Sequence, residues 1–111
     1  TEEGFIIPAN KRAEAFSEIL ASYGFNEQET ADFIEYWADY LKDGTDYVMH
    51  PMLTEGVDNA MPLTFSVKPD SIYRIWFGFA EYSGDEITPP EITPIVRKGF
   101  TVVEWGGAVL D

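Results

Sequence analysis

The chain has 111 residues, of which 20 are acidic and 7 basic, so its formal net charge is −13 at pH 7. A chain of this length is expected to form a single domain and can bury a core without disulfides or a structural metal. It contains no cysteine, which excludes disulfides and thiolate metal ligands. The acidity argues against a nucleic-acid partner, because binding phosphate backbones requires a basic surface. Its apolar runs are far shorter than the roughly 20 residues of a membrane-spanning helix, so we expect no membrane span.

The first helix is predicted at residues 11–23, where apolar side chains recur at helical spacing. Asn10 directly before it offers an N-cap, and Gly24 directly after it is typical of a left-handed C-cap. Phe25 beyond the glycine can fold back on the helix.

A second helix is predicted from a capping box formed by Asn26 and Glu29 to about residue 42. Its broad apolar face is expected to bury the aromatic side chains of Phe33, Trp37 and Tyr40. The opposite, solvated face carries Gln28, Asp32, Glu35, Tyr36, Asp39 and Asp43. The two-residue connection between the helices predicts an αα-hairpin.

The most apolar run, residues 71–79, predicts the central strand, because β-branched and aromatic residues fill it and turn formers bound it. Successive side chains of a strand point to opposite faces. The expected core face carries Tyr73, Ile75, Phe77 and Phe79. The other face carries Ile72, Arg74, Trp76 and Gly78, which indicates either partial cover by another element or an exposed aromatic strip.

Three further strands are expected before the central one, at residues 5–7, 47–53 and 63–67. The first is expected at an edge of the sheet, and Pro51 argues for an edge position or a bend in the second. Residues 54–62 are expected to form a loop. The strand at 63–67, with Phe65 facing inward, is expected to form an antiparallel hairpin with the central strand.

Residues 88–94 contain three prolines, which exclude a central strand and predict a stiff crossing segment. The last strand is predicted at residues 100–105, with Gly106 and Gly107 ending it. The pattern therefore predicts one domain, 1–111, of the α+β class. In this two-layer fold an N-terminal αα-hairpin packs on a mostly antiparallel sheet of four or five strands, whose order stays open.

Catalytic chemistry finds little support in the sequence. The only imidazole is His50, no serine lies in a nucleophile-elbow glycine pattern, and one histidine lacks the ligand spacing of a zinc site. A carboxylate pair for glycoside hydrolysis is not nominated by any spacing among the acids. We therefore expect a protein that is not an enzyme and has no cofactor.

Residues 43–46, Asp-Gly-Thr-Asp, gather oxygen ligands in one turn. The turn falls short of the alternating acids of a dedicated calcium loop, so two readings remain open. One is a calcium site, and the other is a plain turn in which Gly44 ends the second helix.

The aromatic side chains that periodicity does not assign to the core are the best binding candidates. They are Trp76, Tyr82 and Trp105, with Arg74 on the same strand as Trp76. Exposed aromatic rings suit sugar stacking or a protein partner. Arg74 is also expected to pair with Glu104 across neighbouring strands.

The stretch at residues 97–107 reads Arg-Lys-Gly-Phe-Thr-Val-Val-Glu-Trp-Gly-Gly. It resembles the closing motif of a family of uncharacterised bacterial domains, found mostly at the C-terminal ends of large secreted or surface-associated proteins. Residues 23–29, 32–37 and 68–74 resemble internal motifs of that family in the same order. Members commonly carry another aromatic-rich β segment upstream, so the resemblance allows this domain to be the C-terminal part of a larger module.

The resemblance implies an extracellular or cell-surface location and a non-catalytic module for interaction, assembly or surface display. Its expected partner is another protein or another domain of the parent protein. The alternative is a carbohydrate-binding module that uses the region of Trp76 and Trp105 to hold a polysaccharide, with or without calcium.

Overall fold

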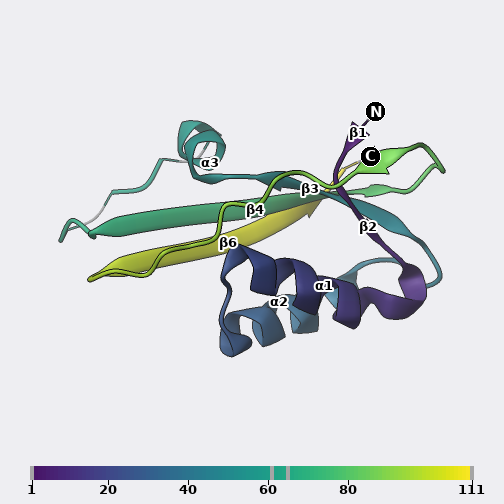
Figure 1. The fold of residues 1–111 in the computed structure, drawn as a ribbon, viewed down its shortest axis with the longest axis horizontal. Coiled ribbons are helices and arrows are strands. Elements are labelled where there is room, and N and C mark those ends of the chain that lie inside the picture. Colours follow the sequence, from purple (N-terminus) through teal and green to yellow (C-terminus); the bar gives the residue numbers. More distant parts are fainter. Residues whose placement is uncertain (1, 61, 65, 111) are drawn as a thin grey trace.

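The computed structural model describes residues 2–60, 62–64 and 66–110. Helices α1 and α2 cover one face of a mixed four-stranded sheet, and a short helix, α3, lies near the strands on the other side (Figure 1). The predicted α+β class, a helical pair on a mostly antiparallel sheet, is confirmed.

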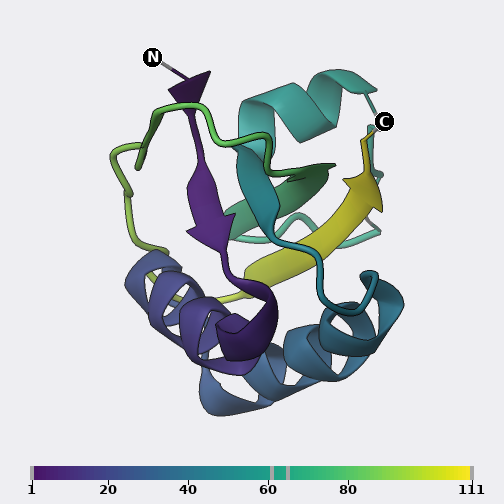
Figure 2. The same cartoon turned by 90° about the vertical axis from the view of Figure 1, so that its right-hand side faces the viewer.

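The main sheet consists of four strands in the order β2-β3-β4-β6 (Figure 2). Their bounds are Phe5–Ile7 for β2, Tyr47–Met52 for β3, Ser71–Glu81 for β4 and Thr101–Val109 for β6. The β2-β3 and β3-β4 pairs are antiparallel and the β4-β6 pair is parallel. The predicted edge strand and central strand are both confirmed. Pro51 lies past the three residues of β3 that β2 pairs, so it sits where the sheet has an edge.

A second, two-stranded sheet lies beside β2. Strands β1 (Glu2–Glu3) and β5 (Ile87–Thr88) pair in parallel, and the amide of Gly4 donates to the carbonyl of Thr88 at 3.0 Å. The β2 side of the main sheet is therefore both short and flanked by β5.

Helix α1 (Arg12–Tyr23) follows a 3-10 turn, η1 (Ala9–Lys11). The predicted N-cap at Asn10 is wrong, because helical structure already starts at Ala9, directly after Pro8. The side chain that receives the first amide is Asp46, whose Oδ1 accepts from Ala9 N at 2.7 Å. The predicted C-cap is confirmed: Gly24 has φ 91°, and the amide of Phe25 donates back into the last turn of α1.

Helix α2 (Glu27–Tyr40) begins with the predicted capping box. Asn26 Oδ1 accepts from Glu29 N, and Glu29 Oε1 accepts from Asn26 N, both at 2.8 Å. The predicted burial of Tyr40 is wrong, since its side chain is 60% exposed. The helix ends there and the chain becomes extended at Leu41, whose side chain takes the place in the core instead.

Arg12 holds the end of α2 in place. Its side chain is 7% exposed and lies 5.6 Å from the ring centroid of Tyr47. The guanidinium donates to the carbonyl oxygens of Ala38, Leu41, Lys42 and Thr45. A cation at these carbonyls satisfies helix-end acceptors and complements the helix dipole. The contacting residues lie 26 to 33 positions from Arg12 in the chain, so periodicity does not reveal these bonds.

Two expectations around β4 are wrong. Residues 54–62, expected as a loop, contain helix α3 (Thr54–Ala60). The expected hairpin strand at 63–67 does not form among the described residues 62–64 and 66–70, and Leu63 and Val67 are exposed. Both sides of β4 are already paired, by β3 and β6, so long-range pairing overrides the local alternation. The expected inward position of Phe65 lies outside the described residues.

The connection from β4 to β6 crosses the sheet, as a parallel pair requires. Its proline-rich part contains no strand after β5, which confirms the predicted crossing segment. Tyr23 O accepts from Ile95 N at 2.8 Å, and the hydroxyl of Tyr73 is hydrogen-bonded to both the carbonyl and the amide of Val96. The crossing segment thus runs on the same face of the sheet as the helices.

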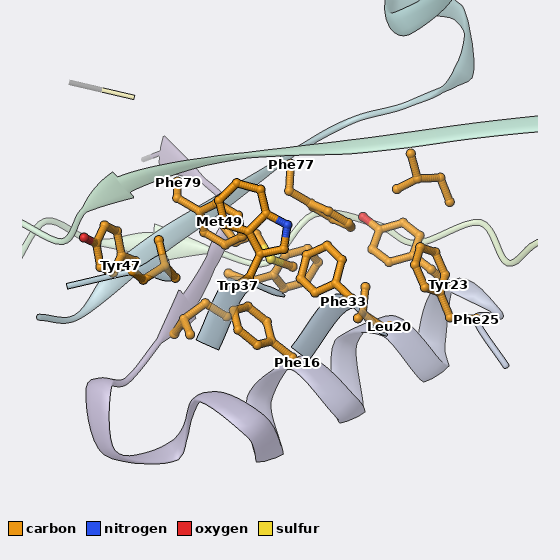
Figure 3. Packing of buried hydrophobic residues seen from close by; sticks show 14 of the residues in the cluster. Phe16, Leu20, Tyr23, Phe25, Phe33, Trp37, Tyr47, Met49, Phe77 and Phe79 are labelled. Atoms are coloured by element: carbon orange, nitrogen blue, oxygen red, sulfur yellow. The ribbon is translucent and has the colours of Figure 1, made fainter. Parts of the chain in front are cut away.

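The core lies between this helix pair and the sheet (Figure 3). Phe33 is at its centre, with ring centroids 5.3 Å from Phe16, 5.6 Å from Phe77 and 5.2 Å from Trp105. Most of these ring pairs meet edge to face or tilted, geometries favoured by the aromatic quadrupole. Three of the four predicted core-face residues of β4 are buried, whereas Tyr73 is half-buried.

Candidate functional site at the open edge of strand β6

Arg74, one of the predicted binding residues, is a buried structural residue. Its side chain is 1% exposed and donates from Nε to Glu104 Oε1 at 3.0 Å and from Nη1 to Asp58 Oδ1 at 3.1 Å. The predicted cross-strand pair with Glu104 is confirmed. Asp58 belongs to α3, so this short helix is the element that partly covers this face of β4, one of the two alternatives expected for it. Thr54 Oγ1, also on α3, accepts from the backbone amide of Arg74 at 2.9 Å.

Glu104 also accepts a hydrogen bond from Trp76 Nε1 at 2.8 Å. Burial opposes ionisation of this carboxyl group, but the hydrogen bonds from Arg74 and Trp76 outweigh it and hold the pKa of Glu104 below its ordinary value. The same contact with Glu104 raises the pKa of Arg74. The Glu104 carboxylate, itself held by Arg74, therefore fixes the orientation of the Trp76 indole.

Trp76 and Trp105 do not form one aromatic strip. Trp105 pairs in register with Ile75 and packs on Phe33, so it lies on the helix face of the sheet. Trp76 shares the other face with Arg74, because side chains alternate along β4. The two tryptophans lie on opposite faces of the sheet, so they do not form the single aromatic surface that was expected.

Tyr82 lies apart from both tryptophans. It follows the end of β4, where its amide donates to Asp46 O at 2.9 Å and its hydroxyl to Asp85 O at 3.0 Å. It lies six positions along an extended chain from Trp76, which corresponds to roughly 20 Å. We therefore assign Tyr82 to the turn after β4.

Strand β6 does not end at Gly106 as expected but continues through both glycines to Val109. A Cβ on Gly106 would lie 3.1 Å from Cε2 of Trp76, and one on Gly107 would lie 2.6 Å from Cζ2 of Trp37. The two glycines are thus held between a tryptophan ring on each face of the sheet. Their role is close approach of aromatic side chains, which is one reason for glycine inside a strand.

A hollow of about 370 Å³ opens at these glycines. It is lined by Tyr36, Trp37, Trp76, Trp105, Gly106 and Gly107. A second hollow, of about 420 Å³, shares two of these residues and is lined by Asp32, Glu35, Tyr36 and Trp105. Together the two hollows form an aromatic and acidic margin along β6, which we call the β6 margin.

The outer side of β6 is open among the residues that the structure describes. β6 is 9 residues long and is the last strand of the main sheet, with β4 as its neighbour. Phe100 O accepts hydrogen bonds from Asp70 N and Ser71 N, and Leu110 N donates to Phe79 O. Even-numbered residues thus direct their backbone groups toward β4. Because this direction alternates along a strand, the amides and carbonyls of the odd-numbered residues point outward: Thr101, Val103, Trp105, Gly107 and Val109.

The sequence did not single out the helix residues of the β6 margin. Trp37 was assigned to the core, where it also lies, and Asp32, Glu35 and Tyr36 to a solvated face. The available signal was the glycine pair inside a β-type run, since glycine inside a strand can mark a close approach. Tyr36 is 54% exposed, and its ring stacks on Tyr40 with centroids 5.6 Å apart.

The other candidate sites have structural uses. His50 lies in β3, with Nδ1 2.9 Å from Glu3 O and Nε2 3.6 Å from Glu2 Oε1. In the turn proposed for calcium, Asp46 binds the amide of Ala9. Within residues 2–60, 62–64 and 66–110, no group of three or more acidic or histidine side chains is placed to hold a metal ion.

Comparison of the chain with protein-family models, with curated proteins and with solved structures gives no match. In the part of the chain that the structure describes, no helix has both the length and the apolar composition needed to cross a membrane. The geometry of the β6 margin is therefore the feature from which a function can be inferred.

Proposed function

We propose that this domain is a non-catalytic protein-interaction module that docks an extended segment of a partner protein along β6. The observation that carries the proposal is the open, 9-residue edge strand with outward amides and carbonyls. Such an edge is a template for an added strand, in which backbone hydrogen bonds supply affinity and side-chain pockets supply specificity.

The two edges of the sheet differ in a way that supports this role. Natural sheets blunt their edges with short strands, charges, prolines or covering segments. The β2 edge is three residues long and is flanked by β5. In β6, by contrast, the single charged side chain, Glu104, is turned to Arg74 and does not guard the edge. Exposed apolar residues, Phe100 and Val109, lie at its two ends.

The glycine pair of β6 also favours strand addition. Gly106 and Gly107 carry no side chains, and the backbone of the edge there is bordered by aromatic rings on both faces. The rings of Trp76 and Trp37 fill the space where side chains of these two residues would stand, so no side chain of Gly106 or Gly107 shields this part of the edge. The resemblance to C-terminal domains of secreted or surface bacterial proteins agrees with an interaction or assembly role in the cell envelope or outside the cell.

Amide hydrogen exchange measured by NMR tests this proposal. Ligands are first selected with the folded domain from a display library of random peptides. The outward amides of Thr101, Val103, Trp105, Gly107 and Val109 should exchange fast in the free domain and slow down when a selected peptide binds. Selected peptides that bind while these amides exchange as in the free domain would overturn the proposal.

A pair of proline substitutions gives a matched control. Val109→Pro removes an outward amide, so it should weaken peptide binding and leave the melting temperature nearly unchanged. Ala108→Pro removes an amide that points to β4, so it should lower the melting temperature. Equal peptide affinity of the Val109→Pro variant and the parent for a ligand that spans this end of β6 would argue against strand addition there.

Carbohydrate binding is the second candidate, favoured by the four aromatic side chains that line the hollow at the glycines. Aromatic rings stack on sugars, and Trp76 is held in a fixed orientation by Glu104. A glycan array followed by tryptophan fluorescence, with calcium and with chelator, tests it. A polysaccharide hit that Trp76→Ala or Trp105→Ala abolishes would establish this candidate, and silence across the array would leave the protein-interaction proposal ahead.

A further inference from the structure

We propose that the docked segment carries a Lys or Arg side chain that inserts between Tyr36 and Trp105, opposite the carboxylates of Asp32 and Glu35. This inference rests on the proposed strand addition and names the chemistry that β6 selects. The site is the hollow of about 420 Å³ that these four residues line.

Strand geometry places a side chain of the partner at this hollow. A residue added next to Trp105 on the open side of β6 points to the same face of the sheet as Trp105. That face is the helix face, since Trp105 packs on Phe33 of α2. Asp32, Glu35 and Tyr36 project from the same helix, so α2 forms the wall against which the incoming side chain lies.

The lining of the hollow fits a cation better than a neutral or acidic group. Two aromatic rings and two carboxylates converge there, and a cation is attracted both by the face of an aromatic ring and by an opposite charge. The Tyr36 ring is held by a stacked contact with Tyr40 and by an edge contact with Trp37, with centroids 5.6 and 5.0 Å apart. Asp32 is oriented by Gln28, whose Nε2 donates to Asp32 Oδ1 at 2.8 Å.

The net charge of the whole chain also favours a basic segment as the partner. A net charge of −13 attracts basic segments and speeds their encounter at low ionic strength, while like-charged segments are repelled. The open edge provides backbone affinity without sequence preference, and the acidic, aromatic hollow provides the preference for one side-chain class.

The test uses host peptides of alternating Thr and Val with one central guest residue, either Arg or its neutral isostere citrulline. Affinity is measured by fluorescence anisotropy on the intact domain at physiological salt. The Arg peptide should bind roughly tenfold more tightly than the citrulline peptide. Asp32→Asn combined with Glu35→Gln should reduce this ratio to near one, and Tyr36→Ala should reduce it in part.

The matched control is Asp39→Asn, an exposed acid on α2 outside the lining of the hollow. It should leave the Arg-to-citrulline ratio unchanged, which separates the site from general attraction by net charge. All four side chains altered here, Asp32, Glu35, Tyr36 and Asp39, are exposed, so circular dichroism should show folded variants.

Hydrogen exchange of the same complexes separates the two proposals. If Arg and citrulline peptides bind equally and both protect the outward amides of β6, the cation inference is overturned and strand addition stands. If the Arg peptide binds without protecting those amides, strand addition fails, and with it this inference. An equal loss of the Arg preference in Asp39→Asn would likewise overturn the site, because the effect would then come from net charge alone.

Discussion

The guanidinium of Arg74 and the carboxylate of Glu104 join β4 to the edge strand β6, with Nε and Oε1 3.0 Å apart and the arginine side chain 1% exposed. The two residues are register partners in the parallel β4-β6 ladder. Their side chains lie on the face of the sheet that α3 covers, and β6 is the strand on which we place partner docking. The pair therefore both stabilises the fold and holds the edge strand β6 in position beside β4.

Glu104→Gln should lower stability near neutral pH, because it removes a charge that accepts from Arg74 and Trp76. The pKa of Glu104 in the folded state lies below the ordinary value of 4.5. Its stabilising contribution is therefore complete above that ordinary value and is lost as the pH falls through the lower folded-state value. Urea unfolding of the parent and the variant should differ at pH 7 and converge as the pH falls below the folded-state pKa of Glu104. Glu91→Gln, in the exposed crossing segment, should show no such convergence, and a parallel offset of parent and Glu104→Gln at all pH values would contradict the prediction.

Tyr23→Phe should be neutral or stabilising by up to about 1 kcal/mol, because the tyrosine hydroxyl is buried without a hydrogen-bond partner among the described residues. Burial raises the pKa of Tyr23 to about 12 from 10.0. The neutral form is thus favoured in the folded state, and this contribution is present below pH 10 and lost as the pH rises toward 12. The melting temperature should fall more steeply with rising pH across this range for the parent than for the variant. A clear destabilisation of Tyr23→Phe at pH 7 would show that the hydroxyl has a partner, such as a water molecule.

Arg12→Lys should destabilise the domain by about 1 to 3 kcal/mol. Lysine keeps the charge but lacks the planar fork with which the guanidinium reaches several carbonyls at the end of α2. Chemical denaturation measures the loss, and faster amide exchange in the last turn of α2 should accompany it. Lys11→Ala, at the exposed neighbouring position, should change stability by no more than about 0.5 kcal/mol. Equal stability of Arg12→Lys and the parent would mean that charge alone holds this helix end.

Gly107→Ala should destabilise the domain by about 1 to 3 kcal/mol, because its Cβ would meet both Trp37 Cζ2 at 2.6 Å and Phe77 O at 2.8 Å. Gly106→Ala should cost less, since its nearest contact is the Trp76 ring at 3.1 Å. Melting temperatures of the two variants provide the comparison. The reverse order of destabilisation would show that the Trp76 side of β6 is packed more rigidly than the Trp37 side.

Added salt should stabilise the fold at neutral pH, because screening weakens repulsion among the charges that make up the net −13. The melting temperature should rise between low and physiological salt. A melting temperature that falls instead would indicate that ion pairs such as Arg74 with Glu104 outweigh the spread repulsion.

Much of the fold followed from local patterns in the chain. The capping box at Asn26 and Glu29, the left-handed cap at Gly24 and the apolar run at 71–79 each specify their structure through neighbouring residues, and each prediction is confirmed. The Arg74 and Glu104 pair also followed, because alternation puts both side chains on one face of adjacent strands.

The α+β class, the helical pair and the central strand thus follow from local sequence, because they depend on periodicity and on caps that act over a few residues. The strands that pair with β4 are set by long-range contacts, and with them the absence of the expected hairpin at 63–67 among the described residues. Long-range contacts also make Gly106 and Gly107 continue a strand between Trp76 and Trp37 and leave β6 at the edge of the sheet. These features depend on which distant segments meet, and burial and close packing between segments set that choice.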